Sequence, residues 1–273
     1  MKHMNDAWTR ILDNDFAVPQ GVRPVDLLDD LLDGLAAADP AVRDGLVYPV
    51  FATWVERGHF DDSAELVGER ICTQLAHPQI QARTFATLII AELVSRDTAR
   101  PIVSASVMGR WYDAFSCWWL AEKDLRGYDT SLGWLHAVAH GADTVGAFGV
   151  SRHSDAERLR DLIGLVITRV LRDEHLWDAL EDQRLALALT STLLRDELAH
   201  NDVEAWLLRI SQALRRDADA VPVPVWRQNL LRLMNAVYVH ASRARLTEDG
   251  ASRWSSIEPA LTDTIRSAWP PLA

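Results

Sequence analysis

Two histidines and an aspartate are spaced at helical intervals near the middle of the chain, at His136, His140 and Asp143. On a helix that advances about 100° per residue, positions four and seven apart lie on one face. That face would present two imidazoles and a carboxylate, which are groups that transfer protons or bind divalent metals. These three residues are therefore the candidate catalytic residues of the chain.

One interpretation is a metal site in which His136 and His140 chelate a divalent cation. On a regular helix, however, His136 and Asp143 would be about 10.5 Å apart, which is too far for both to bind one ion comfortably. Asp143 would then orient His140, and a carboxylate such as Glu122 or Asp182 would complete the ligand set. The expected cofactor in this interpretation is a divalent metal ion.

A second interpretation needs no metal. One histidine acts as a general acid or base, Asp143 fixes its tautomer, and Arg126 binds an anionic group. Trp118 or Trp134 would supply an apolar wall. A third interpretation is that the two histidines only form hydrogen bonds across packed helices. The residues alone leave all three open.

Apolar residues repeat at intervals of three and four along most of the chain, which indicates amphipathic helices. We therefore expect helices to position these side chains. The clearest stripe runs from Leu159 to Leu171. Breakers such as Asp39-Pro40 and His77-Pro78 divide the chain into roughly 11–13 helices, too many for one bundle core. We predict an all-α fold, a right-handed stack of antiparallel helix pairs in a HEAT-like α-solenoid.

The helix that carries the candidate site is expected to follow a polar loop and to include both Trp134 and His136. Its small residues Ala137, Gly141 and Thr144 lie on a separate face, where another helix can approach closely. The expected domain is a single one spanning residues 1–273. Residues 1–5 are expected to be disordered or to derive from an expression tag.

Composition restricts the partners and the compartment. The formal net charge is −11, without a basic patch that would attract nucleic acid or an anionic membrane. A nucleic-acid-binding helical repeat is therefore disfavoured, and no run of about 18 apolar residues predicts a membrane span. The two cysteines cannot form a disulfide framework, which favours the cytoplasm. Phosphate loops, GxSxG elbows, CxxC pairs and EF-hand loops are missing.

Several short segments point to a known family. They are Arg126-Gly127-Tyr128, Gly133-Trp134-x-His136-Ala137-x-Ala139-His140-Gly141-Ala142-Asp143, Arg83-Thr84-Phe85 and Glu181-Asp182-Gln183-Arg184-Leu185. Together they resemble the signature of a bacterial family of uncharacterised HEAT-like helical proteins, domain of unknown function 2785. The resemblance implies that Arg83, Arg126, His136, His140, Asp143, Asp182 and Arg184 gather in one place. The chain departs from the family pattern at Leu125 and at Trp118-Trp119.

We therefore expect a small-molecule-binding helical-repeat protein with a polar pocket and histidine acid/base or metal-assisted chemistry. The residues expected to bind the ligand are Arg83, Glu122, Arg126, Tyr128, Trp134, Asp182 and Arg184. The alternative is a non-catalytic HEAT-like scaffold that holds a partner protein in its groove.

Overall fold

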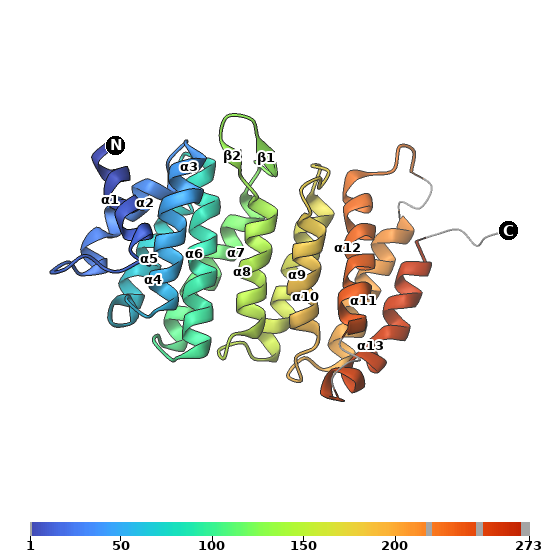
Figure 1. Cartoon of the computed structure of the whole chain (residues 1–273). Helices are drawn as coiled ribbons and strands as arrows, with labels where there is room; N and C mark the ends of the chain where they lie inside the picture. Colours follow the sequence, from blue (N-terminus) through green and yellow to red (C-terminus); the bar gives the residue numbers. More distant parts are fainter. Residues whose placement is uncertain (1, 217–219, 244–247, 269–273) are drawn as a thin grey trace. The chain divides into compact units, whose positions relative to one another are not determined.

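The computed structural model of this chain describes residues 2–216, 220–243 and 248–268 (Figure 1). Most of these residues are helical, and a short antiparallel hairpin pairs Tyr128–Asp129 with Gly133–Trp134. The predicted all-α class is confirmed. No helix in the described part of the chain is both long and apolar enough to cross a lipid bilayer.

Two compact units make up the chain, Met1–His153 and Ser154–Ala273. The helices and strands of the first unit are α1 (Lys2–Asp13), η1 (Pro24–Leu27), α2 (Leu28–Leu35), α3 (Pro40–Val42), η2 (Arg43–Val47), α4 (Tyr48–Glu56), η3 (Asp61–Ser63), α5 (Ala64–Gln74), α6 (Ile80–Ala99), α7 (Ala105–Ala121), β1 (Tyr128–Asp129), β2 (Gly133–Trp134) and α8 (Ala137–Val150). The helices of the second unit are α9 (Ala156–Arg172), α10 (Glu181–Leu193), α11 (His200–Arg216), α12 (Val225–Ser242) and α13 (Glu248–Arg266). The single domain expected from the sequence stays a prediction.

Helix α6 is the centre of the first unit. Its apolar residues surround the helix instead of forming one stripe, so neighbours must cover it on several sides. Helix α4 packs on one side of α6 and α8 on the other, while α5 and α7 also contact it (Figure 1). Large rings such as Trp111, Phe115 and Trp119 fill the space beside α7 and are fully buried.

Helices α6 and α8 run parallel to each other. His140 contacts the backbone of Thr84, and one turn later the hydroxyl of Thr144 donates to the carbonyl oxygen of Thr87 at 2.8 Å. The two helices therefore run in the same direction along this contact. Parallel neighbours are possible because the antiparallel helix α7 and the hairpin lie between them in sequence.

In the second unit, α10 packs against α12, while α11 and α12 both pack against α13. Helix α9 begins after Asp155, whose carboxylate accepts a hydrogen bond from the amide of Arg158 at 2.9 Å. The predicted apolar stripe is buried from Leu159 to Val170, and the stripe explains why this helix packs on one face.

Candidate functional site

Helix α8 begins later than the sequence predicts. It starts at Ala137, whereas His136 precedes it with a φ of 52° and Trp134 belongs to strand β2. The amides of Leu135 and His136 both donate to the carbonyl oxygen of Gly127, at 2.9 and 3.2 Å, and these bonds hold the segment outside the helix. The prediction that Trp134 and His136 are helical was therefore wrong.

The two imidazoles nevertheless lie close together, with 5.3 Å between the ring centroids of His136 and His140. Trp134 stacks flat on His136 at 4.5 Å, and Phe85 of α6 meets the ring of His140 edge-on at 5.0 Å. His140 is buried, with 4% of its surface exposed, while His136 is half-buried. The pair therefore combines one imidazole held in the interior with one nearer the surface.

The backbone of α6 fixes the tautomer of His140. Its Nδ1 atom lies 3.3 Å from the carbonyl oxygen of Thr84. A carbonyl oxygen only accepts hydrogen bonds, so Nδ1 must carry the hydrogen. In the neutral ring, Nε2 is then the nitrogen that accepts a hydrogen bond or a proton. This is the arrangement that a general base requires.

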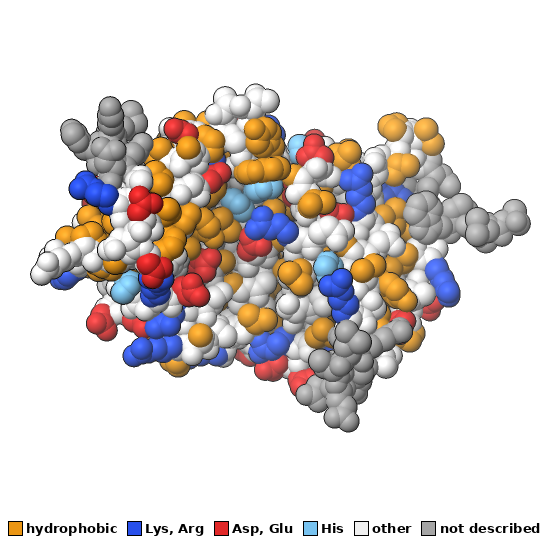
Figure 2. Space-filling view, viewed as in Figure 1, with side chains coloured by type: hydrophobic (Ala, Val, Ile, Leu, Met, Phe, Trp, Pro, Cys, Tyr) orange, Lys and Arg blue, Asp and Glu red, His pale blue; other side chains and the backbone are white. Residues whose placement is uncertain are grey.

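The hairpin presents two aromatic rings next to the imidazoles. Tyr128 and Trp134 face each other across the strand pair, with ring centroids 5.0 Å apart. Their exposed fractions are 54% and 48%, which is high for large hydrophobic residues. Histidine side chains reach the surface at the N-terminal end of α8, beneath the hydrophobic side chains of the hairpin (Figure 2). We call Trp134, His136 and His140 the imidazole site.

Arg43 holds the hairpin in place, and the sequence analysis missed it. Its fully buried guanidinium donates to the carbonyl oxygens of Leu132 at 2.7 Å, Trp134 at 3.3 Å and Ala37 at 3.1 Å. It also lies over the ring of Phe85, 4.8 Å from the centroid. One side chain thus contacts both the hairpin and the ring that packs against His140.

A carboxyl group with a raised pKa lies on α6, in contact with α4. The hydroxyl of Tyr48 on α4 donates to Glu92 on α6 at 3.1 Å. Burial raises the pKa of Glu92, and the charges of Glu56 and Asp143 raise it further, although the Tyr48 hydrogen bond opposes them. Asp143 is therefore close enough to Glu92 to influence its protonation. Glu92 keeps its proton at higher pH than an ordinary glutamate.

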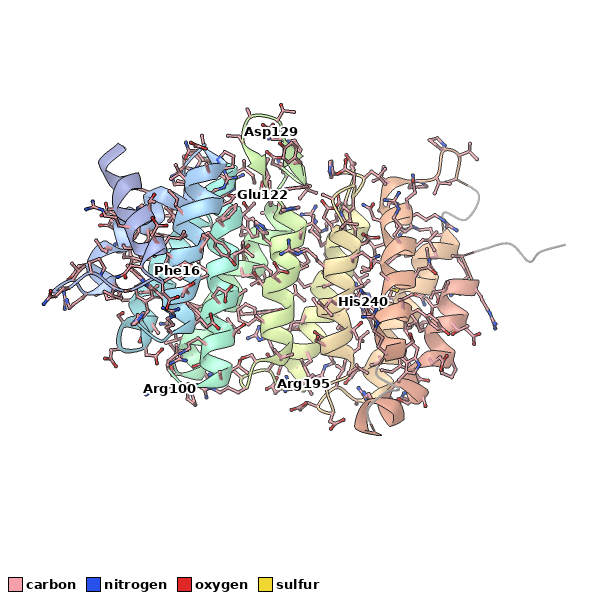
Figure 3. The ribbon with its side chains drawn as sticks, in the orientation of Figure 1. Phe16, Arg100, Glu122, Asp129, Arg195 and His240 are labelled. Carbon is pink, nitrogen blue, oxygen red and sulfur yellow. The ribbon has the colours of Figure 1, made fainter. Side chains whose placement is uncertain are left out.

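Glu122 and Arg83, both predicted to bind ligand, are bound to each other. Arg83 donates to both carboxylate oxygens of Glu122, at 2.6 and 3.0 Å, and the indole of Trp118 donates to one at 3.0 Å. The amides of Lys123 and Asp124 donate to the other, each at 3.0 Å. Figure 3 labels Glu122 just below the hairpin. These contacts tie α6 to the end of α7, so we infer a structural role.

Arg126, predicted to bind an anion, is paired within its own loop. Its guanidinium binds Asp124 at 2.7 Å and also binds Asp129, which Figure 3 labels in the hairpin. The hydrogen bonds with Asp124 raise the pKa of Arg126 above its ordinary value, and Asp129 adds to that effect. These two carboxylates more than offset the charge of Arg126, so its attraction for an anionic ligand is weakened.

Asp182 and Arg184, also predicted to bind ligand, lie in the first turn of α10 in the second unit, whereas the residues of the imidazole site belong to the first unit. His136 and His140 were also predicted to bind a metal. Among the described residues, no three His, Cys, Asp or Glu side chains are grouped so that they could hold a metal ion.

The profile of a family described as a protein of unknown function (DUF2785) matches residues 72–239, more than half of the chain. The chain belongs to the DUF2785 family. No curated protein and no solved structure matched it. The DUF2785 match begins in α5 and ends in α12, so it includes His136 and His140, whereas Arg43 precedes it.

Proposed function

We propose that this DUF2785 protein binds a small polar molecule at the imidazole site and that His140 exchanges a proton with it. The observation that carries the proposal is the pair of adjacent imidazoles, in which Thr84 makes Nε2 of His140 the basic nitrogen.

The proposed ligand is uncharged or positively charged, not anionic. The sequence-based expectation of an anion rested on Arg126, which two carboxylates already bind. Beside the imidazoles, Trp134 exposes an aromatic surface, and Asp143 follows His140 by one turn on α8. Carboxylates and aromatic rings together favour amines or amides over carboxylates and phosphates.

Two substitutions separate a role in binding from a purely structural role. In His140→Asn, the amide nitrogen can replace Nδ1 and keep the bond to Thr84, while the position of Nε2 is lost. In His140→Gln, the longer side chain can place its amide at the position of Nε2, but the bond to Thr84 is lost. If the site works as proposed, His140→Asn folds normally but loses ligand binding, and His140→Gln retains part of it.

The probe is a panel of primary amines, primary amides and carboxylates, added to protein with labelled histidine rings and followed by NMR. We expect an amine or amide to shift the ring signals of His136 and His140, while the exposed His59 serves as control. An unchanged response in His140→Asn, or no shift with any compound, would exclude the proposal.

A non-catalytic scaffold is the second candidate, favoured by the exposed rings of Tyr128 and Trp134. In this case a partner protein covers the hairpin. Tyr128→Ala combined with Trp134→Ala would then abolish capture of that partner, whereas His140→Asn would leave it intact. The two candidates therefore differ in which variant loses binding.

We also propose HEAT-like stacking within each unit and a cytoplasmic location. Parallel α6 and α8, joined through α7, are what stacked helix hairpins produce. Cys72 and Cys117 are free, and Cys117 is exposed, which suits a reducing compartment. An experimental structure and cell fractionation would test these two points.

A further inference from the structure

Each imidazole of the imidazole site packs against an aromatic side chain. Trp134 of β2 stacks on His136, with 4.5 Å between the ring centroids and 4° between the ring planes. Phe85 of α6 meets His140 at 5.0 Å and 85°. Ring contacts of this kind favour particular relative orientations. The two aromatic residues belong to different elements, a hairpin and a helix, so the orientation of one imidazole relative to the other depends on what connects those elements.

Arg43 contacts both aromatic residues. Its guanidinium donates to the carbonyl oxygen of Trp134 at 3.3 Å and lies over the ring of Phe85, 4.8 Å from the centroid. One chain of contacts therefore runs from Arg43 through the hairpin to His136. Another runs from Arg43 through Phe85 to His140. The two chains end at imidazoles whose centroids are 5.3 Å apart.

The hairpin is seated tightly beside Arg43. Gly133 lies between Leu132 and Trp134, whose carbonyl oxygens both accept from Arg43. Gly133 has a left-handed backbone, with a φ of 75°, and a Cβ atom there would lie 3.0 Å from Cβ of Pro40. Glycine allows both the backbone conformation and the close approach. The hairpin therefore has little room to move toward Pro40.

The backbone that carries Arg43 is also unusual. Arg43 begins η2 (Arg43–Val47), which is a turn of π-helix, a conformation that is rare in proteins and frequent at functional sites. The carboxylate of Asp44 binds Nε of Arg43 at 2.6 Å. A buried guanidinium is costly to desolvate, and apolar residues often stabilise such a position equally well. Stability alone therefore does not account for an arginine here.

We propose that Arg43 is a positioning residue of the imidazole site, which acts through Trp134 and Phe85 to fix the orientation of His136 relative to His140. This inference rests on the proposed function for its consequence, since imidazoles that are already oriented lose less entropy when a ligand binds. The orientation itself can be measured without a ligand.

NMR of protein with labelled histidine rings tests the positioning. A stacked indole shields the protons of the ring beside it, so Trp134→Ala should move mainly the His136 signals, and downfield. Phe85→Leu should move mainly those of His140. Arg43→Lys and Arg43→Met should move both sets in protein that circular dichroism shows to be folded. The His136 signals should move more, because Phe85 is also held by its own helix.

Gly133→Ala tests the hairpin contact without changing Arg43. The added methyl group would push the hairpin away from Pro40. The variant should therefore move the His136 signals and leave those of His140 in place. It also keeps the inference testable if the Arg43 variants do not fold.

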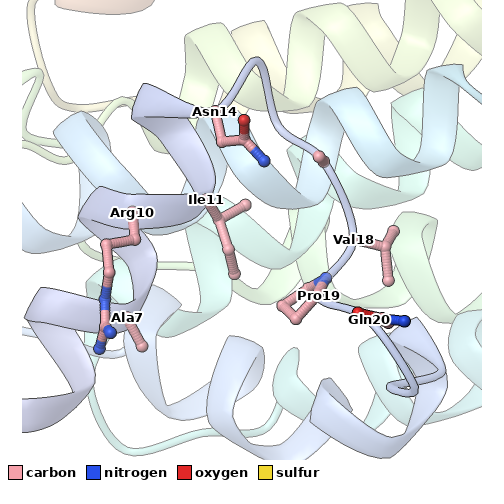
Figure 4. Close-up of a pocket in the computed structure, with 8 residues that line it drawn as sticks. Ala7, Arg10, Ile11, Asn14, Val18, Pro19 and Gln20 are labelled. Carbon is pink, nitrogen blue, oxygen red and sulfur yellow. The ribbon is translucent and has the colours of Figure 1, made fainter.

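Arg57→Met is the matched control. Arg57 also donates to a backbone carbonyl oxygen, that of Asp15, and lies over an aromatic ring, 5.8 Å from the centroid of Phe16. It does so in the turn after α1, whose flanking residues Asn14 and Ala17 line the groove shown in Figure 4. Arg57→Met should leave both sets of imidazole signals unchanged.

Ligand titrations separate this inference from the proposed function. Arg43→Lys should weaken, by several-fold, the binding of the amine or amide that shifts the wild-type ring signals most. If no compound binds the wild type, the proposed function fails, while the ring signals still decide whether Arg43 positions the imidazoles. Signals in the Arg43 variants that match the wild type, or that change equally in Arg57→Met, would overturn the inference. Unchanged affinity in an Arg43 variant whose rings have moved would overturn it too.

Discussion

The Nδ1 atom of His140 lies 3.3 Å from the carbonyl oxygen of Thr84, so an imidazole on α8 is tied to the backbone of α6. One turn further along, the hydroxyl of Thr144 donates to the carbonyl oxygen of Thr87. Both contacts are buried, and together they fix how far one parallel helix is shifted along the other. The position of the candidate base is thus determined by the packing of two helices.

His140→Ala should lower the free energy of unfolding by about 2 kcal/mol, because it removes the hydrogen bond to Thr84 and the ring that packs against Phe85. His140→Asn should lose less, about 1 kcal/mol, because its amide can still donate to Thr84. Urea unfolding of both variants measures the difference. Equal stability of His140→Ala and the wild type would show that the contact contributes nothing.

Replacement of Arg43 should be the most damaging single change near the hairpin. Arg43→Met would leave three part-buried carbonyl oxygens without this donor and Asp44 without its charged partner, and should lower the free energy of unfolding by about 3 kcal/mol. Arg43→Lys keeps the charge but cannot reproduce the forked geometry, so we expect an intermediate loss. Hydrogen exchange should accelerate in residues 127–136 of both variants.

Arg126→Gln provides the matched control for Arg43. Arg126 also forms ion pairs in the hairpin region, but nearly half of its side chain is exposed. Exposed pairs of this kind contribute about 0–1 kcal/mol, so the variant should unfold close to the wild type. A loss as large as that of Arg43→Met would mean that burial does not explain the difference between the two arginines.

The helices could be predicted because apolar residues recur at helical spacing over several turns. The stripe in α9 recurs over several turns, and each of its apolar residues from Leu159 to Val170 is buried as expected. The small face of α8 was also readable from sequence. Trp119 packs against Gly141, and its indole donates to the carbonyl oxygen of Ala137 at 3.3 Å.

The hairpin could not be predicted in the same way. Each strand has two residues, too few to show any alternation, and the left-handed conformation of His136 is held by the distant carbonyl oxygen of Gly127. Arg43 was missed for a related reason. It acts on Leu132 and Trp134, about 90 positions away, and no local pattern reports such a contact.

Gly141→Ala should destabilise the protein although alanine favours helices. A Cβ atom at Gly141 would lie 2.1 Å from Nε1 of Trp119, which is closer than real contacts allow. We expect a loss of about 1–3 kcal/mol in the free energy of unfolding from overpacking. Gly109→Ala in α7 is the control, since nothing lies within 4 Å of its Cβ position. It should instead stabilise by up to about 1 kcal/mol.

Glu92→Gln should stabilise the protein at neutral pH. Burial raises the pKa of Glu92 above its ordinary value of 4.5, so the folded state holds this proton more tightly than the unfolded state. The contribution of Glu92 to stability is therefore fully present below its ordinary pKa and is lost as pH rises through the raised pKa. The variant should match the wild type below the ordinary pKa of 4.5, exceed it by a growing amount as pH rises from there to the raised pKa, and keep a constant advantage above it. Glu174→Gln, in an exposed position, is the control. A wild type that stays as stable as Glu92→Gln across this range would contradict the raised pKa.

Glu122→Gln should show the opposite dependence on pH. Burial alone would raise the pKa of Glu122, but the hydrogen bonds from Arg83 and from the amides of Lys123 and Asp124 outweigh it and lower the pKa. The ionised carboxylate therefore stabilises the fold above the ordinary value of 4.5, and this contribution is lost as pH falls through the lowered pKa.

At about pH 7, Glu122→Gln should lose about 3 kcal/mol, because Arg83 would be left without its charged partner. The gap to the wild type should narrow as pH falls below 4.5 and through the lowered pKa of Glu122, where the wild-type carboxylate is protonated too. Unfolding curves at several pH values test this directly. If the difference in stability between the wild type and the variant stays constant with pH, the charge of Glu122 does not stabilise the junction of α6 and α7. Packing of its side chain would then be what stabilises it.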